Sequence, residues 1–223
     1  MRVDLAVGDR DGSPPPANTE EFDWANLVNF NNPSAWKDVQ LVTPPPPVSA
    51  YDIVKVPSIT VDGTLGDWTG ITSISMADDP NNGRGSANNS ASVKLAWNDT
   101  YLYAAYNVTD TDIQAVQTTR DHAQLYTDDE AELYIDPQGD GASASRMTAT
   151  DYQLLANVLE TLGDNRGTGT GSKDPSYNAA SFSAQSVVTG TLNASGTDVG
   201  YTVELRVSWT DLGVTPAAGH FMR

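Results

Sequence analysis

The chain has 223 residues, a formal net charge of −17 and no cysteine. This length suits one sizeable domain, and the negative charge disfavours nucleic acid and anionic membranes as partners. Without cysteine there can be no disulfide, no cysteine-based zinc site and no thiol nucleophile. No apolar run approaches the length of a membrane-spanning helix. Asp4 and Asp9 interrupt any hydrophobic segment of the kind that a signal peptide needs.

The first part of the chain predicts two strands, at residues 3–9 (VDLAVGD) and 36–42 (WKDVQLV), with a long loop between them. Two strands cannot bury a core by themselves, so they must complete a larger unit. Consecutive prolines follow, which cannot donate sheet hydrogen bonds and favour a stiff polyproline II spacer. We therefore divide the chain into the last strands and loop of a sandwich domain (1–42), a proline-rich linker (43–53) and a main body (54–223).

The main body is dominated by apolar residues that alternate with polar ones, the pattern of strands with one buried face. Strands are predicted within residues 90–110, 129–141 and 199–213. The residues expected on buried faces are Val93, Leu95, Trp97, Leu102, Ala104, Tyr106, Val108, Ala131, Leu133, Ile135, Tyr201, Val203, Leu205, Val207 and Trp209. Short strands separated by turn residues indicate a sandwich or barrel rather than α/β units. Trp68 is expected in the core as well.

Residues 150–165 (TDYQLLANVLETLGDN) fit two periodicities. Their leucines and Val158 have helical spacing, whereas Tyr152, Leu154, Ala156 and Val158 alternate as in a strand. Because the surrounding segments are strands, we predict a strand here. The Gly-, Asn- and Ser-rich stretches at 78–90 and 163–176 predict loops.

Four segments of the main body, in order, carry a resemblance to a known family: PSITVDGTLGDW, KLAWNDTYLYAAYNVTD, DDEAELYID and GYTVELRVSWTDLGVTP. They resemble the family 9 carbohydrate-binding modules and their DOMON-like relatives. The resemblance implies an all-β, jelly-roll-like antiparallel sandwich without catalytic activity. In that family a further strand, a long loop and a final strand should follow the last segment. Here those pieces lie in front, so the order is circularly shifted, with 54–223 followed by 1–42.

The chain's two ends, GVTPAAGHFMR and MRVDLAVGDRDG, share Met-Arg and would continue one strand if they were joined. Three arrangements fit: one period of a tandem array, a subunit whose residues 1–42 complete a neighbour, or a permuted monomer. We expect an array or a self-assembling surface filament, in which copies meet through 1–42 and 219–223. The alternative is a monomeric polysaccharide-binding module of a secreted glycoside hydrolase. Both readings place the protein outside the cell or at its surface.

The resemblance also implies a sugar site with two aromatic platforms and a strand carboxylate. A pyranose presents a C–H face to an aromatic ring, while its hydroxyls need hydrogen-bond partners. The matching residues are Tyr126 and Phe30 as platforms, Glu132 as the carboxylate, and Trp24 and Asn31 near the second platform. This chain departs from the family's pattern, because Tyr and Phe replace tryptophans and Leu155 replaces a basic residue. A working site and a weakened, altered or lost one therefore both stay open.

Calcium is the ion that the resemblance implies, and aspartate-rich turns supply suitable oxygen ligands. The candidate ligands are Asp9 and Asp11 in GDRDG and Asp136 and Asp140 in IDPQGDG. Turn chemistry alone explains the Asp-Gly pairs equally well.

We expect no enzyme. The acidic residues Asp128, Asp129, Glu130 and Glu132 are interpreted as a solvated strand edge rather than as a glycosidase pair. Two histidines offer little material for a catalytic or metal site. Glycosylation sequons occur at Asn88, Asn98, Asn107 and Asn193, which favours a secreted protein.

Overall fold

The computed structural model describes residues 51–76, 90–140, 146–174, 176–194 and 197–222 in full, and the backbone of the strands at 2–9, 20–23 and 37–42. Its strands are β1 (Arg2–Asp9), β2 (Glu20–Asp23), β3 (Lys37–Val42), β4 (Tyr51–Lys55), β5 (Ile74–Met76), β6 (Ser90–Trp97), β7 (Tyr101–Thr109), β8 (Glu130–Asp136), β9 (Tyr152–Asn157), β10 (Leu162–Gly167), β11 (Lys173–Asp174), β12 (Ser183–Thr189), β13 (Gly200–Ser208) and β14 (Phe221–Met222). Two short 3-10 helices are η2 (Gly66–Trp68) and η3 (Leu125–Thr127). No helix in these ranges is long and apolar enough to cross a membrane.

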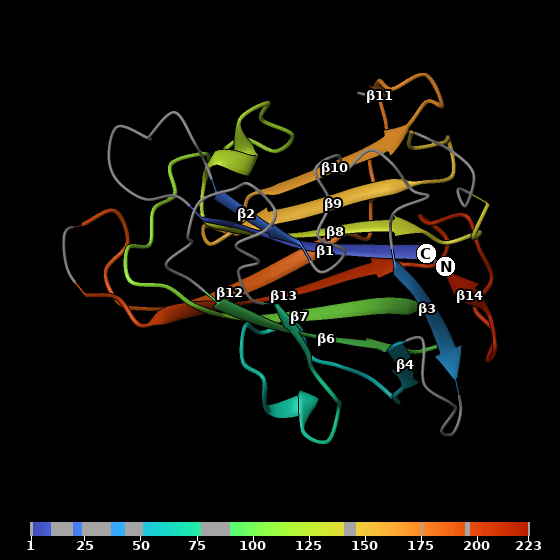
Figure 1. Ribbon diagram of the computed structural model, residues 1–223, viewed down its shortest axis with the longest axis horizontal. Coiled ribbons are helices and arrows are strands. Elements are labelled where there is room, and N and C mark those ends of the chain that lie inside the picture. The colour runs from blue at the N-terminus through green and yellow to red at the C-terminus, as the bar shows by residue number, and fades with distance from the viewer. Residues whose placement is uncertain are drawn as a thin grey trace.

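The strands form two sheets that pack face to face (Figure 1). Sheet A has the order β11-β10-β9-β8-β1, with β2 paired to β1, and sheet B has the order β4-β6-β7-β13-β12, with β5 paired to β6. Strand β3 connects the sheets by pairing with both β1 and β4. Neighbouring strands are antiparallel except in the β3–β4 and β4–β6 pairs, which are parallel. The predicted antiparallel β-sandwich is confirmed.

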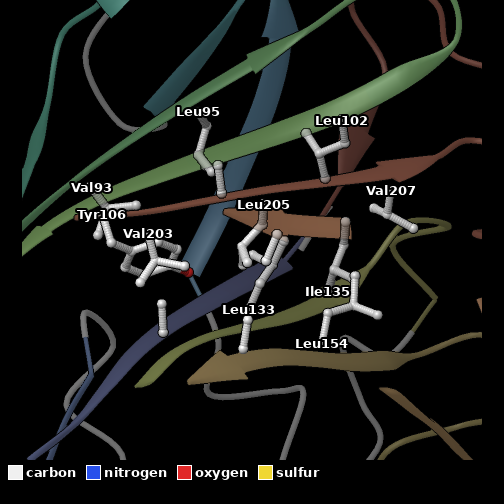
Figure 2. Packing of buried hydrophobic residues seen from close by; sticks show 14 of the residues in the cluster. Val93, Leu95, Leu102, Tyr106, Leu133, Ile135, Leu154, Val203, Leu205 and Val207 are labelled. Carbon is white, nitrogen blue, oxygen red and sulfur yellow. The ribbon is translucent and has the colours of Figure 1, made fainter. Parts of the chain in front are cut away.

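The core lies between the sheets and contains the residues that alternation predicts (Figure 2). From sheet B, Val93, Leu95, Leu102 and Val203 face the core, and all are at most 2% exposed. Burying each such side chain contributes about 1.5–3 kcal/mol. The predicted core tryptophans Trp97 and Trp209 pack edge to face, with ring centroids 6.3 Å apart. On sheet A, Ala131, Leu133 and Ile135 of β8 complete the core, together with Leu154 and Ala156 of β9.

The ambiguous segment 150–165 is extended, as predicted, but it forms a hairpin rather than one strand. β9 ends at Asn157, whose side-chain Oδ1 accepts hydrogen bonds from the backbone N–H groups of Leu159 and Thr161. Glu160 adopts a left-handed φ of 63° in the same turn. An asparagine that caps a turn in this way competes with continued strand pairing, so the chain reverses and returns as β10.

The outer face of sheet B is covered by the segment 56–71. Ile59, Trp68 and Ile71 of this segment pack on Ala96, Tyr103 and Ala105 of the sheet. Trp68 is fully buried, as predicted, but it lies in this second cluster and not between the sheets.

The two ends of the described chain lie in line on β3. β14 pairs through Phe221↔Gln40 and Met222↔Val39, and β1 continues with Arg2↔Asp38 and Val3↔Lys37. The four pairs follow one another along β3, so β14 and β1 form two pieces of one strand, and the two termini lie side by side in Figure 1. Here both pieces belong to the same chain. β4 begins at Tyr51 and so includes the last three residues of the predicted linker, whereas residues 43–50 lie outside the described residues.

Candidate functional site

The outer face of sheet A carries a row of polar side chains. Since Leu133 and Leu154 face each other in the core, their neighbours along the strands point the other way. The register places Tyr134 opposite Gln153, and Gln153 opposite Asn165. Glu132 faces Leu155 in the next row. Polar groups from three neighbouring strands are thereby brought together.

Gln153 is the centre of this row. Its Nε2 donates hydrogen bonds to Glu132 Oε1 and, over 2.8 Å, to the Tyr134 hydroxyl. Its Oε1 accepts hydrogen bonds from Lys173 Nζ and, over 3.3 Å, from Asn165 Nδ2. A single amide therefore links a buried carboxylate on β8 to an ammonium group on the edge strand β11.

A cavity of about 320 Å³ opens beside the row. Its lining includes the rings of Tyr126 and His122, the apolar side chain of Leu155 on β9, and the polar side chains of Gln153, Asn165 and Lys173. Tyr126 is 55% exposed, so its ring is accessible to a ligand. The cavity thus combines an aromatic ring, an apolar patch and hydrogen-bonding side chains, as sugar sites do.

The position of Tyr126 follows from local packing. It lies on η3, and the preceding Leu125 is buried and anchors that helix. A Cβ at Gly163 would come within 3.0 Å of Leu125 Cδ2 and of Leu155 Cδ2. A glycine on β10 therefore lets η3 and the β9–β10 hairpin approach closely enough to form this end of the cavity.

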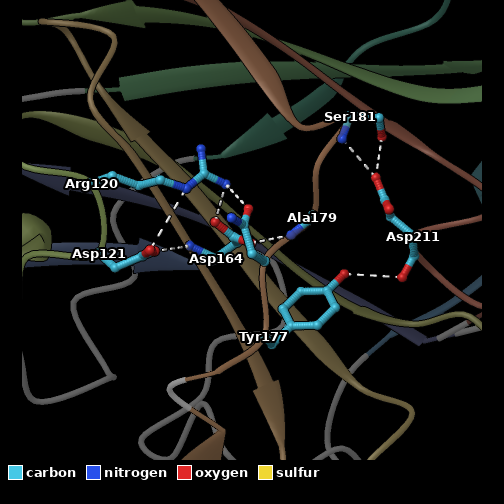
Figure 3. Close-up of polar contacts among 8 residues, drawn as sticks. Arg120, Asp121, Asp164, Tyr177, Ala179, Ser181 and Asp211 are labelled. Carbon is cyan, nitrogen blue, oxygen red and sulfur yellow. Dashed lines mark hydrogen bonds and ion pairs between the residues drawn. The ribbon is translucent and has the colours of Figure 1, made fainter.

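A charged network holds the neighbouring loop in place (Figure 3). Arg120 forms an ion pair with the buried Asp164, whose Oδ2 accepts a hydrogen bond of 2.5 Å from Ala179 N. Asp121 Oδ1 accepts a hydrogen bond of 2.9 Å from Asp164 N. Burial raises the pKa of Asp164, and Arg120 acts against that rise. The wall of the cavity near Asp121 is thereby tied to β10 and to the segment leading to β12.

The predicted sugar-site residues are only partly brought together. Tyr126 lines the cavity, whereas Glu132 is 2% exposed and is linked to the cavity through Gln153. Phe30, Trp24 and Asn31 lie outside the described residues. The sequence analysis missed the other polar residues of the cavity, which are Asp121, His122, Gln153, Asn165 and Lys173. The alternation of 150–165 could have revealed Gln153, whereas Lys173 lies in a stretch predicted as a loop.

The predicted solvated acidic edge is wrong. Asp128, Asp129, Glu130 and Glu132 are all at most 2% exposed. Asp128 Oδ2 accepts hydrogen bonds of 2.8 Å from Gln117 N and Asn157 Nδ2. Asp129 Oδ2 accepts one of 2.5 Å from Gln114 N. Asp128 and Asp129 thus accept hydrogen bonds from backbone N–H groups of the loop before η3, so they fasten that loop instead of meeting solvent.

Two of the predicted metal ligands do cluster. Asp136, Asp140 and Asp151 bring one carboxylate oxygen each within 4.8 Å of the others. Asp136 Oδ1 accepts a hydrogen bond of 2.6 Å from Gly139 N, and Asp151 Oδ2 accepts one of 2.5 Å from Thr148 N. Asp151 Oδ1 is buried and has no hydrogen-bond partner in the part of the chain that the structure describes. Burial, reinforced by the charges of Asp136 and Asp140, raises the pKa of Asp151 to about 7.

The other two predicted ligands lie elsewhere. Asp9 ends β1, and Arg2 at the opposite end of that strand pairs with Asp136. Seven residues of strand separate Asp9 from this cluster, or about 23 Å at ~3.3 Å per residue. Asp11 lies outside the described residues. Asp151, which the sequence analysis missed, directly precedes β9 and comes back to the end of β8 through the β8–β9 connection.

The predicted sequons differ in how their asparagines are used. Asn98 Oδ1 accepts hydrogen bonds from Thr100 N and Tyr101 N, and its Nδ2 donates one to the Tyr103 hydroxyl. Asn193 exchanges two hydrogen bonds with the backbone of Ala115. Asn107 is exposed on β7, and Asn88 lies outside the described residues. Of the three that the structure describes, Asn107 is thus the one best placed to accept a glycan.

Comparisons with known proteins agree with this fold. No curated protein matches the chain. A family 9 carbohydrate-binding module from Caldicellulosiruptor kristjanssonii is similar in structure, both in complex with cellotriose (19% identity, 76% of this chain and 72% of that chain, TM-score 0.54) and in complex with glucose (19%, 76% and 73%, 0.53). A protein from Bacteroides uniformis is also similar (12% identity, 75% and 76%, TM-score 0.52). At these identities the similarity shows the fold. Residues 61–222, well over half of the chain, match the family described as carbohydrate family 9 binding domain-like, and the chain therefore belongs to that family.

Proposed function

We propose that this protein is a non-catalytic binding domain that works outside the cell and holds the end of a polysaccharide in the cavity beside Tyr126. One observation carries the proposal: an exposed aromatic ring lines a cavity whose lining also carries amide, imidazole and ammonium groups. The module from Caldicellulosiruptor kristjanssonii was solved with cellotriose and with glucose. We therefore infer that the ligand contains glucose or a similar neutral sugar.

The ring of Tyr126 would stack on the C–H face of the terminal sugar, while the polar row meets its hydroxyls. Phe30, with Trp24 and Asn31, remains the predicted second platform. Hydrolysis would require two carboxyl groups flanking a glycosidic bond. Glu132 is instead buried and bonded to Gln153, which supports binding rather than catalysis.

The test compares Tyr126→Ala and Tyr126→Phe with the unaltered protein. We expect Tyr126→Ala to weaken binding at least tenfold, which corresponds to about 1.4 kcal/mol. Tyr126→Phe keeps the stacking ring and should bind within about threefold of the unaltered protein. Titration calorimetry with cellotriose and retention on a panel of neutral polysaccharides measure this. Val199→Ala, which changes another exposed apolar residue just before β13, is the control.

Unchanged binding in Tyr126→Ala would contradict the proposed site. Failure of the unaltered protein to bind any neutral glycan would contradict the proposed function.

Calcium binding by Asp136, Asp140 and Asp151 is a second part of the proposal. Three carboxylates offer the hard oxygen ligands that Ca²⁺ prefers, and the residues fit because Asp151 Oδ1 is buried with no donor in the described residues. A bound Ca²⁺ would offset most of the negative charge of the three carboxylates and hold the connection between β8 and β9. We expect calorimetry to show Ca²⁺ binding and the melting temperature to rise with added Ca²⁺, because a ligand of the folded state stabilises it. Asp151→Ala should lose both effects, whereas the exposed Asp67→Ala should keep them. No heat of binding at millimolar Ca²⁺ would contradict this site.

A repeating surface unit is the second candidate function, favoured by the alignment of β14 and β1 on β3. In an array or filament, residues 1–42 of one copy would pair with the body of the next copy in the same register. Light scattering with electron microscopy distinguishes the two arrangements. Regular filaments that disappear when residues 1–42 are deleted would support strand sharing. Compact monomers would contradict the repeating surface unit, and the binding domain would then be the one remaining candidate function.

A further inference from the structure

Besides the tyrosine at position 126, the cavity departs from the pattern that the family resemblance implies at Leu155, which stands in place of a basic residue. Leu155 is 5% exposed and lies at the cavity, so it makes that part apolar. Its cross-strand neighbour Glu132 is nevertheless still a carboxylate, and it is 2% exposed. A buried carboxylate is costly unless hydrogen-bond donors compensate it. Another cation should therefore replace the basic residue that β9 lacks at position 155.

This cation is Lys173, which comes from the edge strand β11 of sheet A. Lys173 lies on β11, where Lys173 pairs with Gly167 of β10, and its side chain reaches across to Gln153 of β9. Gln153 in turn donates to Glu132 on β8. A chain of hydrogen bonds therefore runs across sheet A, from the Lys173 ammonium group on the edge strand through the Gln153 amide to the Glu132 carboxylate on β8.

The hydrogen bonds of Gln153 fix which way its side-chain amide points. A glutamine amide has two N–H donors and one oxygen with two lone pairs. Both donors are used, by Glu132 and Tyr134, and both lone pairs are used, by Lys173 and Asn165. Rotating the amide by 180° would turn its oxygen toward the carboxylate and its N–H groups toward the ammonium. The ammonium of Lys173 thus fixes the orientation of Gln153, and no capacity of that amide is left for a ligand.

We propose that Lys173 is the specificity-determining cation of the sugar cavity and that Gln153 is a positioning residue. This inference rests on the proposed function. Lys173 is exposed and lines the cavity together with Asn165 and Tyr126, so its ammonium group meets the hydroxyls at the rim of a sugar stacked on the ring. The apolar side chain of Leu155, at the position where the resemblance implies a basic residue, also lines the cavity. The ligand that fits is a neutral sugar end whose hydroxyls face the β11 side.

Lys173→Met tests the inference, with Lys173→Arg as the conservative variant. We expect Lys173→Met to weaken binding of cellotriose, or of the neutral glycan bound best, at least tenfold. Lys173→Arg should stay within about threefold of the unaltered protein. Lys55→Met removes an equally charged side chain, one that pairs with Asp99 on the other sheet, and should leave affinity unchanged. Melting temperatures should change little in Lys173→Arg and Lys55→Met. Lys173→Met should lower the melting temperature modestly, because the buried Glu132 then loses the cation that reaches it through Gln153.

A second readout needs no sugar. The side-chain amide resonances of Gln153 in ¹H–¹⁵N spectra should shift and exchange faster with solvent in Lys173→Met, and keep their native positions in Lys173→Arg. Native resonances in Lys173→Met would overturn the positioning role.

Glycan affinity unchanged in Lys173→Met, but lost in Tyr126→Ala, would overturn the inference and leave the proposed function standing. Affinity unchanged in both variants would overturn the site itself. An unaltered protein that binds no glycan would remove the function on which the inference rests.

Discussion

The outer faces of the two sheets each hold a buried glutamate, but they use it differently. On sheet B, Glu204 accepts hydrogen bonds from Trp68 Nε1 (2.6 Å), Asp62 N (2.8 Å) and Gly63 N (2.6 Å). All three donors belong to the covering segment 56–71. On sheet A, Glu132 is bonded to the neighbouring strand through Gln153, and the row leads on to Lys173 and the cavity. The same residue type closes one face and connects the other to a cavity.

The difference comes from the covering chain rather than from the strands. Gly63 has a φ of 81°, and a Cβ there would lie 2.9 Å from the backbone carbon of Ser186. Only a residue without a side chain lets the segment approach β12 so closely, in a conformation that glycine adopts readily. The segment 56–71 thereby supplies the N–H groups that bond the carboxylate of Glu204. On sheet A the 3-10 helix η3 lies beside a cavity instead.

Removing the carboxylate of Glu204 should have the largest effect on stability among the changes to the two outer faces. Glu204→Ala leaves an indole N–H and two backbone N–H groups without their acceptor at a buried site, which costs about 3 kcal/mol of the free energy of unfolding. Urea denaturation measures the loss. Sugar affinity of the folded fraction should not change, because the cavity lies on the other sheet. Glu204→Gln retains one acceptor and should lose less. A loss below about 1 kcal/mol in Glu204→Ala would show that the cover does not depend on this carboxylate.

The contrast between the faces also marks what the sequence could predict. Alternation along β6, β7, β8 and β13 predicted the core, because a strand with one buried face repeats every second residue. It could not predict which outer-face acids are covered, since the cover comes from segments distant in sequence. Asp128 was expected in solvent and is buried, and Trp68, which was expected in the core, belongs to the covering segment 56–71 and packs on the outer face of sheet B.

The candidate site shows the same limit. Tyr126 was predicted only through the family resemblance. Asp151 and Lys173 come to their sites through chain reversals whose register no local pattern specifies.

A larger side chain at Gly163 should lower sugar affinity clearly but stability only modestly. Gly163→Ala places a methyl group 3.0 Å from the ends of Leu125 and Leu155, so these side chains at η3 and β9 must give way at this end of the cavity. We expect a modest loss of about 1 kcal/mol in the free energy of unfolding, as for other overpacked sites. Sugar affinity should fall severalfold. Calorimetry and urea denaturation on the same preparation measure the two effects. An unchanged affinity with a large loss of stability would mean that η3 is only structural.

The smallest expected effect is a dependence on pH that belongs to Glu204 alone. Burial raises the pKa of Glu204 above its ordinary value of 4.5, and the nearby charge of Asp62 adds to the rise, whereas the hydrogen bonds from Trp68, Asp62 and Gly63 oppose it. The folded state then binds a proton more tightly than the unfolded chain does. Its contribution to the free energy of unfolding is fully present below pH 4.5 and is lost as the pH rises through the folded pKa.

Glu204→Gln has no such proton. Between pH 7 and pH 4.5 the free energy of unfolding of the unaltered protein should therefore rise relative to that of Glu204→Gln. Parallel urea titrations at each pH cancel the contributions of the remaining acids. A constant difference would mean that the segment 56–71 supplies enough hydrogen bonds to hold Glu204 ionised at its ordinary pKa.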